Sequence, residues 1–232
     1  ADKNVAKLRL AIEPSEKSIS DLTAKFSKLA KTGSESNTKI ALLIGPNKSS
    51  VYTEFLPNEM NPSDRRYISF FIKPLSLIQN LTVVEPTNIL IDSKSSDGVL
   101  YWRTDTHWNQ KGSYLAFKSL MQKLGLKYPN VEFKQSKKTH SGDLISIGKL
   151  KGFPLKDDDN WDYKILADSQ ITIDELKDQP KDRFGWQSTV INKKAPNDMI
   201  VWVIGDSFLS VIKPYIDVSF KEVKYKDNHY EG

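Results

Sequence analysis

The sequence predicts an α/β protein, a three-layer sandwich with helices on both sides of a mostly parallel central sheet. Two short apolar segments, 39–45 and 199–205, indicate buried strands, and each ends at a glycine. Segments with apolar residues at spacings of three and four indicate amphipathic helices between the strands. Strands that alternate with helices favour this layered class of fold.

The N-terminal part of the chain predicts two helices and two strands. Ile19, Leu22, Phe26 and Leu29 form one apolar helical face. The first strand ends at Gly45-Pro46, and Pro74 should break the second helix. The predicted elements are a helix over 15–31, a strand over 39–45, a long turn over 46–57, a helix over 61–71 and a strand over 81–85.

The remaining elements surround a segment of different composition. Residues 135–198 are polar, carry an acidic run and contain short β-like pieces, so we expect an insertion or a small β-rich lobe within a single domain over 1–232. The other predicted elements are strands over 99–102, 128–134, 199–205 and 219–225 and helices over 111–124 and 208–215.

Composition excludes several classes of protein. Hydrophobic residues make up 38% and charged residues 27% of the 232 residues, which is ordinary for a globular protein. The absence of cysteine excludes disulfides, thiolate metal sites and cysteine nucleophiles. The net charge is +5, but the lysines are scattered without an arginine-rich stripe, so we expect no nucleic-acid partner.

An acid and a histidine stand one residue apart just after the predicted 99–102 strand. On an extended segment Asp105 and His107 would point the same way. The carboxylate can then fix the tautomer of the imidazole and stabilise its protonated form. A metal site needs a third ligand, and no second paired histidine is present, so we predict no metal. We assign no role to His140, which lies in a polar turn.

The stretch VWVIGDSF places Ser207 between a predicted buried strand and a predicted helix. The carboxyl ends of parallel strands meet at one edge of a sheet, so Ser207 and His107 can meet there. The backbone N–H groups of Ser207 and Phe208, at the start of the helix, would bind an oxyanion. Alternatively, Ser207 is a helix N-cap and Asp206 satisfies backbone donors.

The order of these motifs resembles a known family. YWRTDTHWNQKGSYLAF followed downstream by VIGDSF resembles the SGNH-hydrolase-like proteins of the alginate and exopolysaccharide O-acetyltransferase group. In ordinary SGNH esterases the serine block comes first, whereas here the Asp–His pair precedes it, as in that group. PNKSSVYTEFLP and HSGDL, at 140–144, also resemble family segments, and the resemblance spans roughly residues 39–225.

The resemblance implies a serine-dependent O-acetyltransferase of SGNH-like fold, with Ser207 as nucleophile, His107 as base and Asp105 as its orienting partner. Such an enzyme moves acetyl groups through an acyl-serine to hydroxyls of a secreted or cell-envelope polysaccharide, without a cofactor. The resemblance implies a periplasmic or extracytoplasmic location, with membrane association as an option, and a membrane acyltransferase as acetyl donor. The family would continue further than the 25 residues after Ser207, so we expect a truncated C-terminus.

The sequence leaves more than one role open for several residues, and more than one function open for the chain. Trp108 is a stacking wall for a sugar or a core residue, and Asn109 is expected to cap the following helix. Arg103, Lys48 and Tyr52 contact substrate or are solvated surface residues. The same triad would also suit an acetylesterase or deacetylase, and a non-catalytic polysaccharide-binding scaffold is the remaining alternative.

Overall fold

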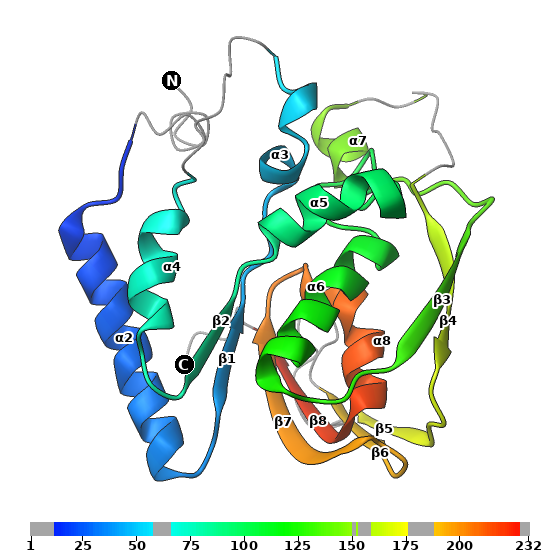
Figure 1. Ribbon diagram of the computed structural model, residues 1–232. Helices are drawn as coiled ribbons and strands as arrows, with labels where there is room; N and C mark the ends of the chain where they lie inside the picture. The colour runs from blue at the N-terminus through cyan, green and yellow to red at the C-terminus, as the bar shows by residue number, and fades with distance from the viewer. Residues whose placement is uncertain (1–11, 58–65, 150–151, 153–158, 176–187, 228–232) are drawn as a thin grey trace. The chain divides into compact units, whose positions relative to one another are not determined.

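The computed structural model describes residues 12–57, 66–149, 152, 159–175 and 188–227. The chain divides into two compact units, residues 1–92 and 93–232, which are considered separately (Figure 1). Helix α5, Thr87–Asp97, crosses the boundary between them. The prediction of a single domain with an inserted lobe over 135–198 stays a prediction.

The N-terminal unit packs two helices against a two-stranded parallel sheet. Its core consists of Ala30, Phe71, Leu75, Leu81 and Val83. Burying a leucine such as Leu75 contributes about 2 kcal/mol. The elements are α2 (Glu16–Glu35), β1 (Ile40–Leu43), α3 (Lys48–Val51), the 3-10 turn η1 (Thr53–Phe55), α4 (Ser69–Ser76) and β2 (Leu81–Val84).

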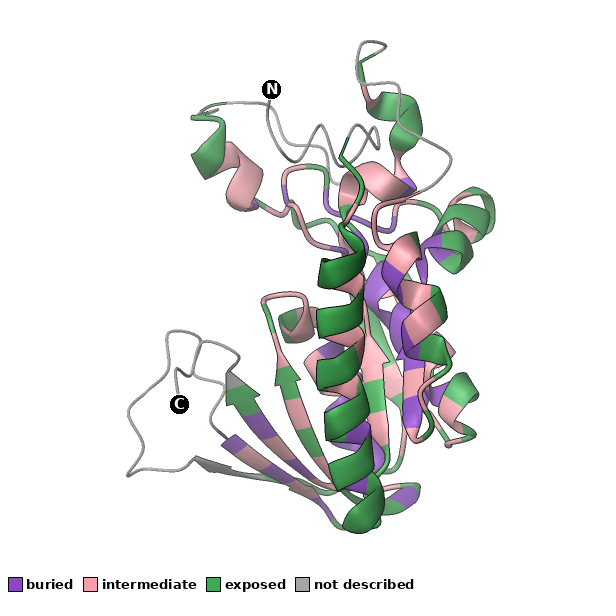
Figure 2. Cartoon of the chain, turned by 90° about the vertical axis from the view of Figure 1, so that its left-hand side faces the viewer, coloured by how far each residue is buried: buried purple, intermediate pink, exposed green. Residues whose placement is uncertain are grey.

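Helix α2 is amphipathic, as its apolar spacing predicts. Ser15 caps it by accepting a hydrogen bond from the backbone N–H of Ser18 at 3.1 Å. Ile19, Leu22 and Phe26 pack on the core, while the opposite face is exposed (Figure 2). Pro74 lies inside α4 and does not break it, and the predicted start of that helix at 61–65 lies outside the described residues.

The C-terminal unit pairs helices with two small sheets. The sheet β3–β4 is antiparallel, and the second sheet has the order β5-β6-β8-β7. The elements are α6 (Gln110–Leu124), β3 (Asn130–Gln135), α7 (Asp143–Ile147), β4 (Trp161–Leu166), β5 (Ile171–Glu175), β6 (Ser188–Asn192), β7 (Asn197–Gly205), α8 (Leu209–Ser219) and β8 (Phe220–Asp227). Helices α6 and α8 lie side by side in Figure 1, and Tyr114 and Phe117 pack on Tyr215 between them.

The described strands form small, mixed sheets, whereas the sequence predicts one mostly parallel central sheet. Parallel pairing occurs in β1–β2 and in β7–β8. Strand β6 joins β8 in the antiparallel sense, and β5 pairs with β6 as its antiparallel neighbour. The correction arises because the chain between β4 and β7 adds two strands to one edge of β8.

The predicted strand over 99–102 is wrong. Tyr101 forms an isolated antiparallel bridge with Trp108, and the intervening backbone turns. Asn109 supplies hydrogen bonds that a neighbouring strand would otherwise supply. Its backbone N–H donates to the Leu100 carbonyl at 2.9 Å, and its Nδ2 donates to the Val99 carbonyl at 2.7 Å. Tyr101 is buried, so the apolar run predicted burial correctly but not a strand.

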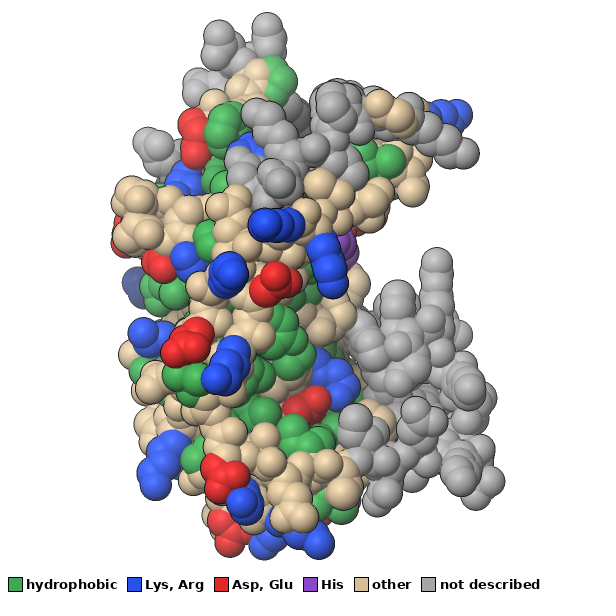
Figure 3. All heavy atoms as spheres, turned by 90° about the vertical axis from the view of Figure 1, so that its right-hand side faces the viewer, with side chains coloured by type: hydrophobic (Ala, Val, Ile, Leu, Met, Phe, Trp, Pro, Cys, Tyr) green, Lys and Arg blue, Asp and Glu red, His purple; other side chains and the backbone are tan. Residues whose placement is uncertain are grey.

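Surface charge is mixed on the face shown in Figure 3, where lysine and arginine side chains alternate with acidic ones. Within the described ranges, no helix combines the length and apolar character that crossing a bilayer requires.

Candidate active site

Asp105 and His107 contact each other through a tight turn that leads into α6. Asp105 Oδ1 accepts the backbone N–H of His107 at 3.0 Å and lies 2.6 Å from His107 Nδ1. A carboxylate that accepts the N–H two residues later is typical of an Asx turn. The predicted pair therefore forms, but in a turn and not on the extended segment that the sequence suggested.

Ser207 lies on the other side of the imidazole. Its Oγ is 2.7 Å from His107 Nε2, although the two residues are 100 positions apart. Ser207 occupies the turn between β7 and α8. The structure thus brings together the hydroxyl, the imidazole and the carboxylate in the order Ser207, His107, Asp105. Their catalytic roles stay predictions.

The carboxylates around His107 favour its protonated form. The hydrogen bond that His107 donates to Asp105 raises the pKa of His107 above its ordinary value, against the effect of burial, and the charges of Asp143 and Asp206 raise it further. Burial opposes ionisation of Asp105, but hydrogen bonds from His107 and His140 outweigh it and hold the pKa of this carboxyl well below its usual range. Ionised Asp105 accepts a hydrogen bond from the Nδ1–H group of His107, which leaves Nε2 of the neutral ring free of hydrogen and able to accept from the Ser207 hydroxyl.

Ser207 does not cap α8. The cap residue is Phe208, without a side-chain cap bond, so the N-cap alternative for Ser207 is wrong. Asp206 does satisfy a backbone donor, since its Oδ1 accepts the Phe208 N–H at 3.0 Å. The Phe208 N–H is therefore occupied in this conformation, and the oxyanion hole of Ser207 and Phe208 stays a prediction. No acceptor for the Ser207 N–H is found among the described residues.

Two further side chains hold the Asp105–His107 turn, and the sequence analysis gave neither a role. His140 Nε2 lies 2.9 Å from Asp105 Oδ2. Asp143 accepts the Thr106 backbone N–H at 2.8 Å through Oδ1 and the Thr106 hydroxyl through Oδ2. Both belong to the HSGDL stretch, whose family resemblance was a signal that could have pointed to them.

Position 142 requires glycine because the backbone there lies very close to the Asp105 side chain. A β-carbon on Gly142 would lie 2.4 Å from the Asp105 β-carbon and 2.6 Å from Asp105 Oδ2. The backbone is held at this distance because the Gly142 N–H donates to Thr104 Oγ1 at 3.1 Å and the Leu144 N–H donates to the Thr104 carbonyl at 3.0 Å. Segment 140–144 therefore packs directly on the turn that carries the acid and the base.

Trp108 is a core residue, so the predicted stacking wall for a sugar is wrong for this structure. Only 1% of Trp108 is exposed, its Nε1 donates to the Phe208 carbonyl at 3.1 Å, and its ring meets the Phe208 ring edge to face. This contact ties the turn that carries His107 to the turn that carries Ser207. The alternative of core packing describes Trp108 correctly.

The other predicted residues have separate positions. Asn109 caps α6 as predicted, because its Oδ1 accepts the N–H groups of Lys111 and Gly112 at 3.1 and 3.0 Å. Arg103 has an exposed side chain at the start of the turn. Lys48 begins α3 and Tyr52 follows it, both in the N-terminal unit. Substrate contacts of Arg103, Lys48 and Tyr52 stay predictions.

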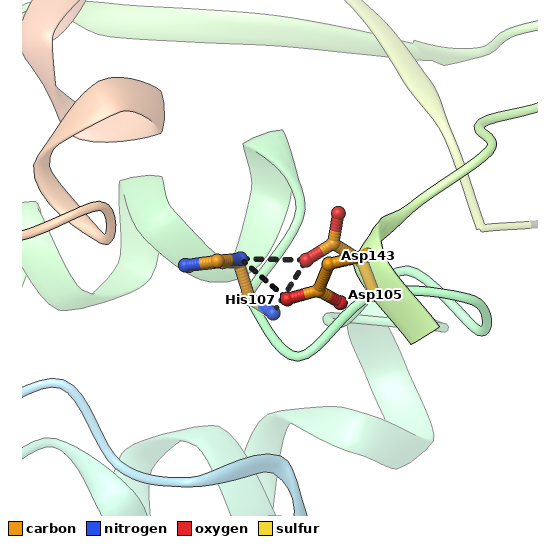
Figure 4. Close-up of side chains that lie close together, drawn as sticks. All are labelled: Asp105, His107 and Asp143. Carbon is orange, nitrogen blue, oxygen red and sulfur yellow. Dashed lines mark hydrogen bonds and ion pairs between the residues drawn. The ribbon is translucent and has the colours of Figure 1, made fainter. Parts of the chain in front are cut away.

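Asp105, His107 and Asp143 form a compact cluster of possible metal ligands, with ligand atoms within 4.8 Å of one another (Figure 4). The atoms are already engaged, because His107 Nδ1 pairs with Asp105 and both Asp143 oxygens accept from Thr106. A cation here would have to replace the bond that orients the imidazole. The donor set therefore fits a held histidine better than a metal centre.

Comparison with known proteins identifies the family. Residues 7–208 match the model of the SGNH hydrolase-like domain of acetyltransferase AlgX. A search of curated proteins finds no significant match to the chain. PatB1 of Bacillus cereus is 17% identical with a TM-score of 0.65, over 92% of this chain and 82% of that one.

Two solved structures of Pseudomonas proteins are also similar in fold. The O-acetyltransferase domain of Pseudomonas putida AlgJ is 16% identical with a TM-score of 0.52, over 94% of this chain and 75% of that one. AlgX of Pseudomonas aeruginosa is 14% identical with a TM-score of 0.53, over 88% of this chain and 48% of that one, so this chain spans about half of AlgX. At these identities the likeness shows the SGNH-like α/β fold, and the match over 7–208 confirms the resemblance seen in the motifs. The chain belongs to the family of SGNH hydrolase-like domains of acetyltransferase AlgX.

Proposed function

We propose that this chain is an O-acetyltransferase that moves acetyl groups through an acyl-Ser207 to hydroxyl groups of a polysaccharide. Membership of an acetyltransferase family supports the reaction class. The observation that carries the assignment of residues is the 2.7 Å distance from Ser207 Oγ to His107 Nε2, with Asp105 on the opposite ring nitrogen. A hydroxyl becomes an effective nucleophile when a held base stands beside it.

In the first half-reaction Ser207 takes the acetyl group. His107 Nε2 accepts the Ser207 proton as Oγ attacks the acetyl carbonyl carbon, and Asp105 stabilises the imidazolium that forms. The tetrahedral intermediate then expels the oxygen of the donor. That oxygen takes the proton from His107 Nε2, which leaves acetyl-Ser207 and a neutral imidazole.

In the second half-reaction the acetyl group passes to the acceptor. A sugar hydroxyl gives its proton to His107 Nε2 and attacks the acetyl carbonyl carbon of acetyl-Ser207. The intermediate releases Ser207 Oγ, which recovers the proton from His107. Attack by water in place of the sugar would make the same triad an acetylesterase, so the position of the acceptor decides the outcome.

The oxyanion needs backbone donors beside Ser207. We assign this role to the Ser207 N–H. The Phe208 N–H joins it when the Asp206 carboxylate that now accepts its hydrogen bond turns away. Loss of one donor in such a site typically costs about 3 kcal/mol in the transition state.

The family resemblance supports our proposal for the biological setting of the reaction. We place the reaction outside the cytoplasm, in the periplasm or an equivalent compartment, as the resemblance to AlgX and AlgJ implies. The acceptor is a secreted or cell-envelope polysaccharide, and a membrane acyltransferase delivers the acetyl group. Arg103, Lys48 and Tyr52 are our candidates for substrate contacts.

A transfer assay tests this function. The protein is incubated with an activated acetyl ester and a panel of oligosaccharides, and mass spectrometry follows the sugars, the free acetate and the intact protein. A sugar product heavier by one acetyl group supports the transferase. Acetate alone would assign the esterase, and sugar binding without acylation of Ser207 would assign the non-catalytic scaffold.

A further inference from the structure

Asp105 lies between two imidazoles. Its Oδ1 faces His107 Nδ1 at 2.6 Å, and its Oδ2 faces His140 Nε2 at 2.9 Å. Only 7% of Asp105 is exposed, so these contacts replace most of the water that a free carboxylate would bind. The hydrogen-bonded chain from Ser207 therefore extends one residue beyond the usual three.

The ring of His140 is itself fixed. It stacks on the Trp102 ring, with centroids 4.0 Å apart and planes 15° from parallel. Its backbone carbonyl accepts the Thr104 hydroxyl at 2.8 Å, and Trp102 Nε1 donates to Asn160 Oδ1 at 3.1 Å. A side chain held by its ring and its backbone loses little further freedom when it donates to Asp105.

We propose that His140 is a positioning residue of this active site, which donates Nε2–H to Asp105 Oδ2 and so fixes the carboxylate that orients His107. Its importance for turnover rests on the function proposed above, whereas its effect on His107 does not. The donor holds the plane of the carboxylate with Oδ1 on Nδ1. It also draws negative charge towards Oδ2, which reduces the charge that His107 experiences.

Loss of the His140 donor should change the pKa of His107. The charged groups that face His107 are Asp105, Asp143 at 3.9 Å and Asp206. Thr106, Ser207 and Phe208 are its uncharged neighbours. Without the His140 donor, Asp105 would concentrate its charge on Oδ1. The pKa of His107 should then rise further, because a stronger acceptor favours the protonated ring.

Two substitutions separate donation from packing. His140→Phe keeps an aromatic ring over Trp102 but removes the donor. His140→Gln removes the ring but can keep an N–H donor near the position of Nε2. NMR titration of the histidine ring signals measures the midpoint of His107 in each variant, and stopped-flow release of p-nitrophenol from p-nitrophenyl acetate measures acylation of Ser207.

For a positioning role, we expect His140→Phe to raise the His107 midpoint and slow acylation about tenfold, and His140→Gln to stay close to the wild type in both. An unchanged His107 midpoint in folded His140→Phe would overturn the proposal. So would a Gln variant that is as impaired as the Phe variant, because then the stacking alone matters. The NMR midpoint needs no turnover, so a wild-type protein that fails to acylate would refute the proposed function and leave this test intact.

A double variant tests whether His140 acts through Asp105. His140→Phe added to Asp105→Ala should not move the His107 midpoint further, because His140 acts through Asp105. A further shift in that background would show that His140 acts by another route and would overturn the proposal. His140→Leu serves as a second donor-free variant, and thermal melts establish that each variant is folded.

Discussion

Ser207 Oγ and His107 Nε2 are 2.7 Å apart, and the Trp108 side chain ties the backbones of their two turns together. Trp108 follows His107 directly, and its Nε1 donates to the carbonyl of Phe208, the residue that follows Ser207. The residues that follow the base and the nucleophile are thus bonded to each other, and the donor of this bond, Trp108, is buried. This link makes their separation a property of the fold and not of two loose loops.

The first prediction concerns the nucleophile and the base. Ser207→Ala and His107→Ala should each reduce acylation by at least about a thousandfold, and the double variant should be no worse than either, because the residues act as one unit. The rate of the p-nitrophenol burst measures acylation. Ser146→Ala, an exposed serine of α7, is the matched control and should keep wild-type rates. A folded Ser207→Ala protein that still forms an acetyl-enzyme would refute the assignment.

The second prediction concerns pH. Acylation needs neutral His107, whose pKa lies above the ordinary value of 6.5, so the rate should rise with pH to a midpoint above 6.5. Asp105→Asn removes the main cause of that raised pKa, so the midpoint should move to lower pH. The maximal rate should fall by roughly 10³–10⁴ because the ring loses its correct tautomer.

The same shift affects folding. A raised pKa in the folded state stabilises the protein below the unfolded pKa of His107, and this contribution disappears as the pH rises through the folded pKa. Denaturant titrations of the wild type and His107→Ala at several pH values measure this contribution as a pH-dependent difference in the free energy of unfolding. Midpoints of the activity profile at or below 6.5 would contradict the environment described for His107.

The third prediction concerns the close approach of segment 140–144 to the turn. Gly142→Ala would place a β-carbon 2.4 Å from that of Asp105, so the backbone or the carboxylate has to move. We expect a loss of about 1–3 kcal/mol in the free energy of unfolding, together with slower acylation. Gly148→Ala is the control, because its φ of −80° suits alanine. Equal stability of the two variants would argue against the close packing.

The fourth prediction concerns Asn109, which joins α6 to the buried backbone before the turn. Asn109→Ala removes the α6 cap and the donors to the carbonyls of Val99 and Asp159. The free energy of unfolding should fall by about 2–4 kcal/mol, because a cap is lost and the buried Asp159 carbonyl loses the Asn109 donor, whereas the Val99 carbonyl keeps its bond from Trp161 Nε1. Asn109→Ser keeps a cap acceptor and should lose less. Chemical denaturation monitored by tryptophan fluorescence measures both.

Sequence patterns predicted most of the helices and several strands, because apolar periodicity reports burial directly. The run at 99–102 shows the limit of that inference, since burial there is achieved with Asn109 as the hydrogen-bonding partner and not a strand. The small, mixed sheets could not be predicted from such patterns, because the antiparallel pairing of β6 with β8 depends on contacts distant in sequence.

The sequence likewise indicated some residues of the candidate site and not others. Asp105, His107 and Ser207 were recognised from their residue types and their order in the chain. His140 was not, since a histidine in a polar turn has no pattern that reveals which carboxylate it meets. The engagement of the Phe208 N–H by Asp206 also depends on a side-chain rotamer that no spacing encodes.

Segment 140–144 belongs to the stretch that resembles an accessory lobe, yet its side chains and backbone hold the turn at 104–106. A minimal domain engineered by trimming 135–198 would therefore lose the contacts of His140 and Asp143 that hold this turn, together with strands β4 to β6. Grafts and affinity tags belong instead at the short connection 167–170, between β4 and β5, which contributes none of those bonds.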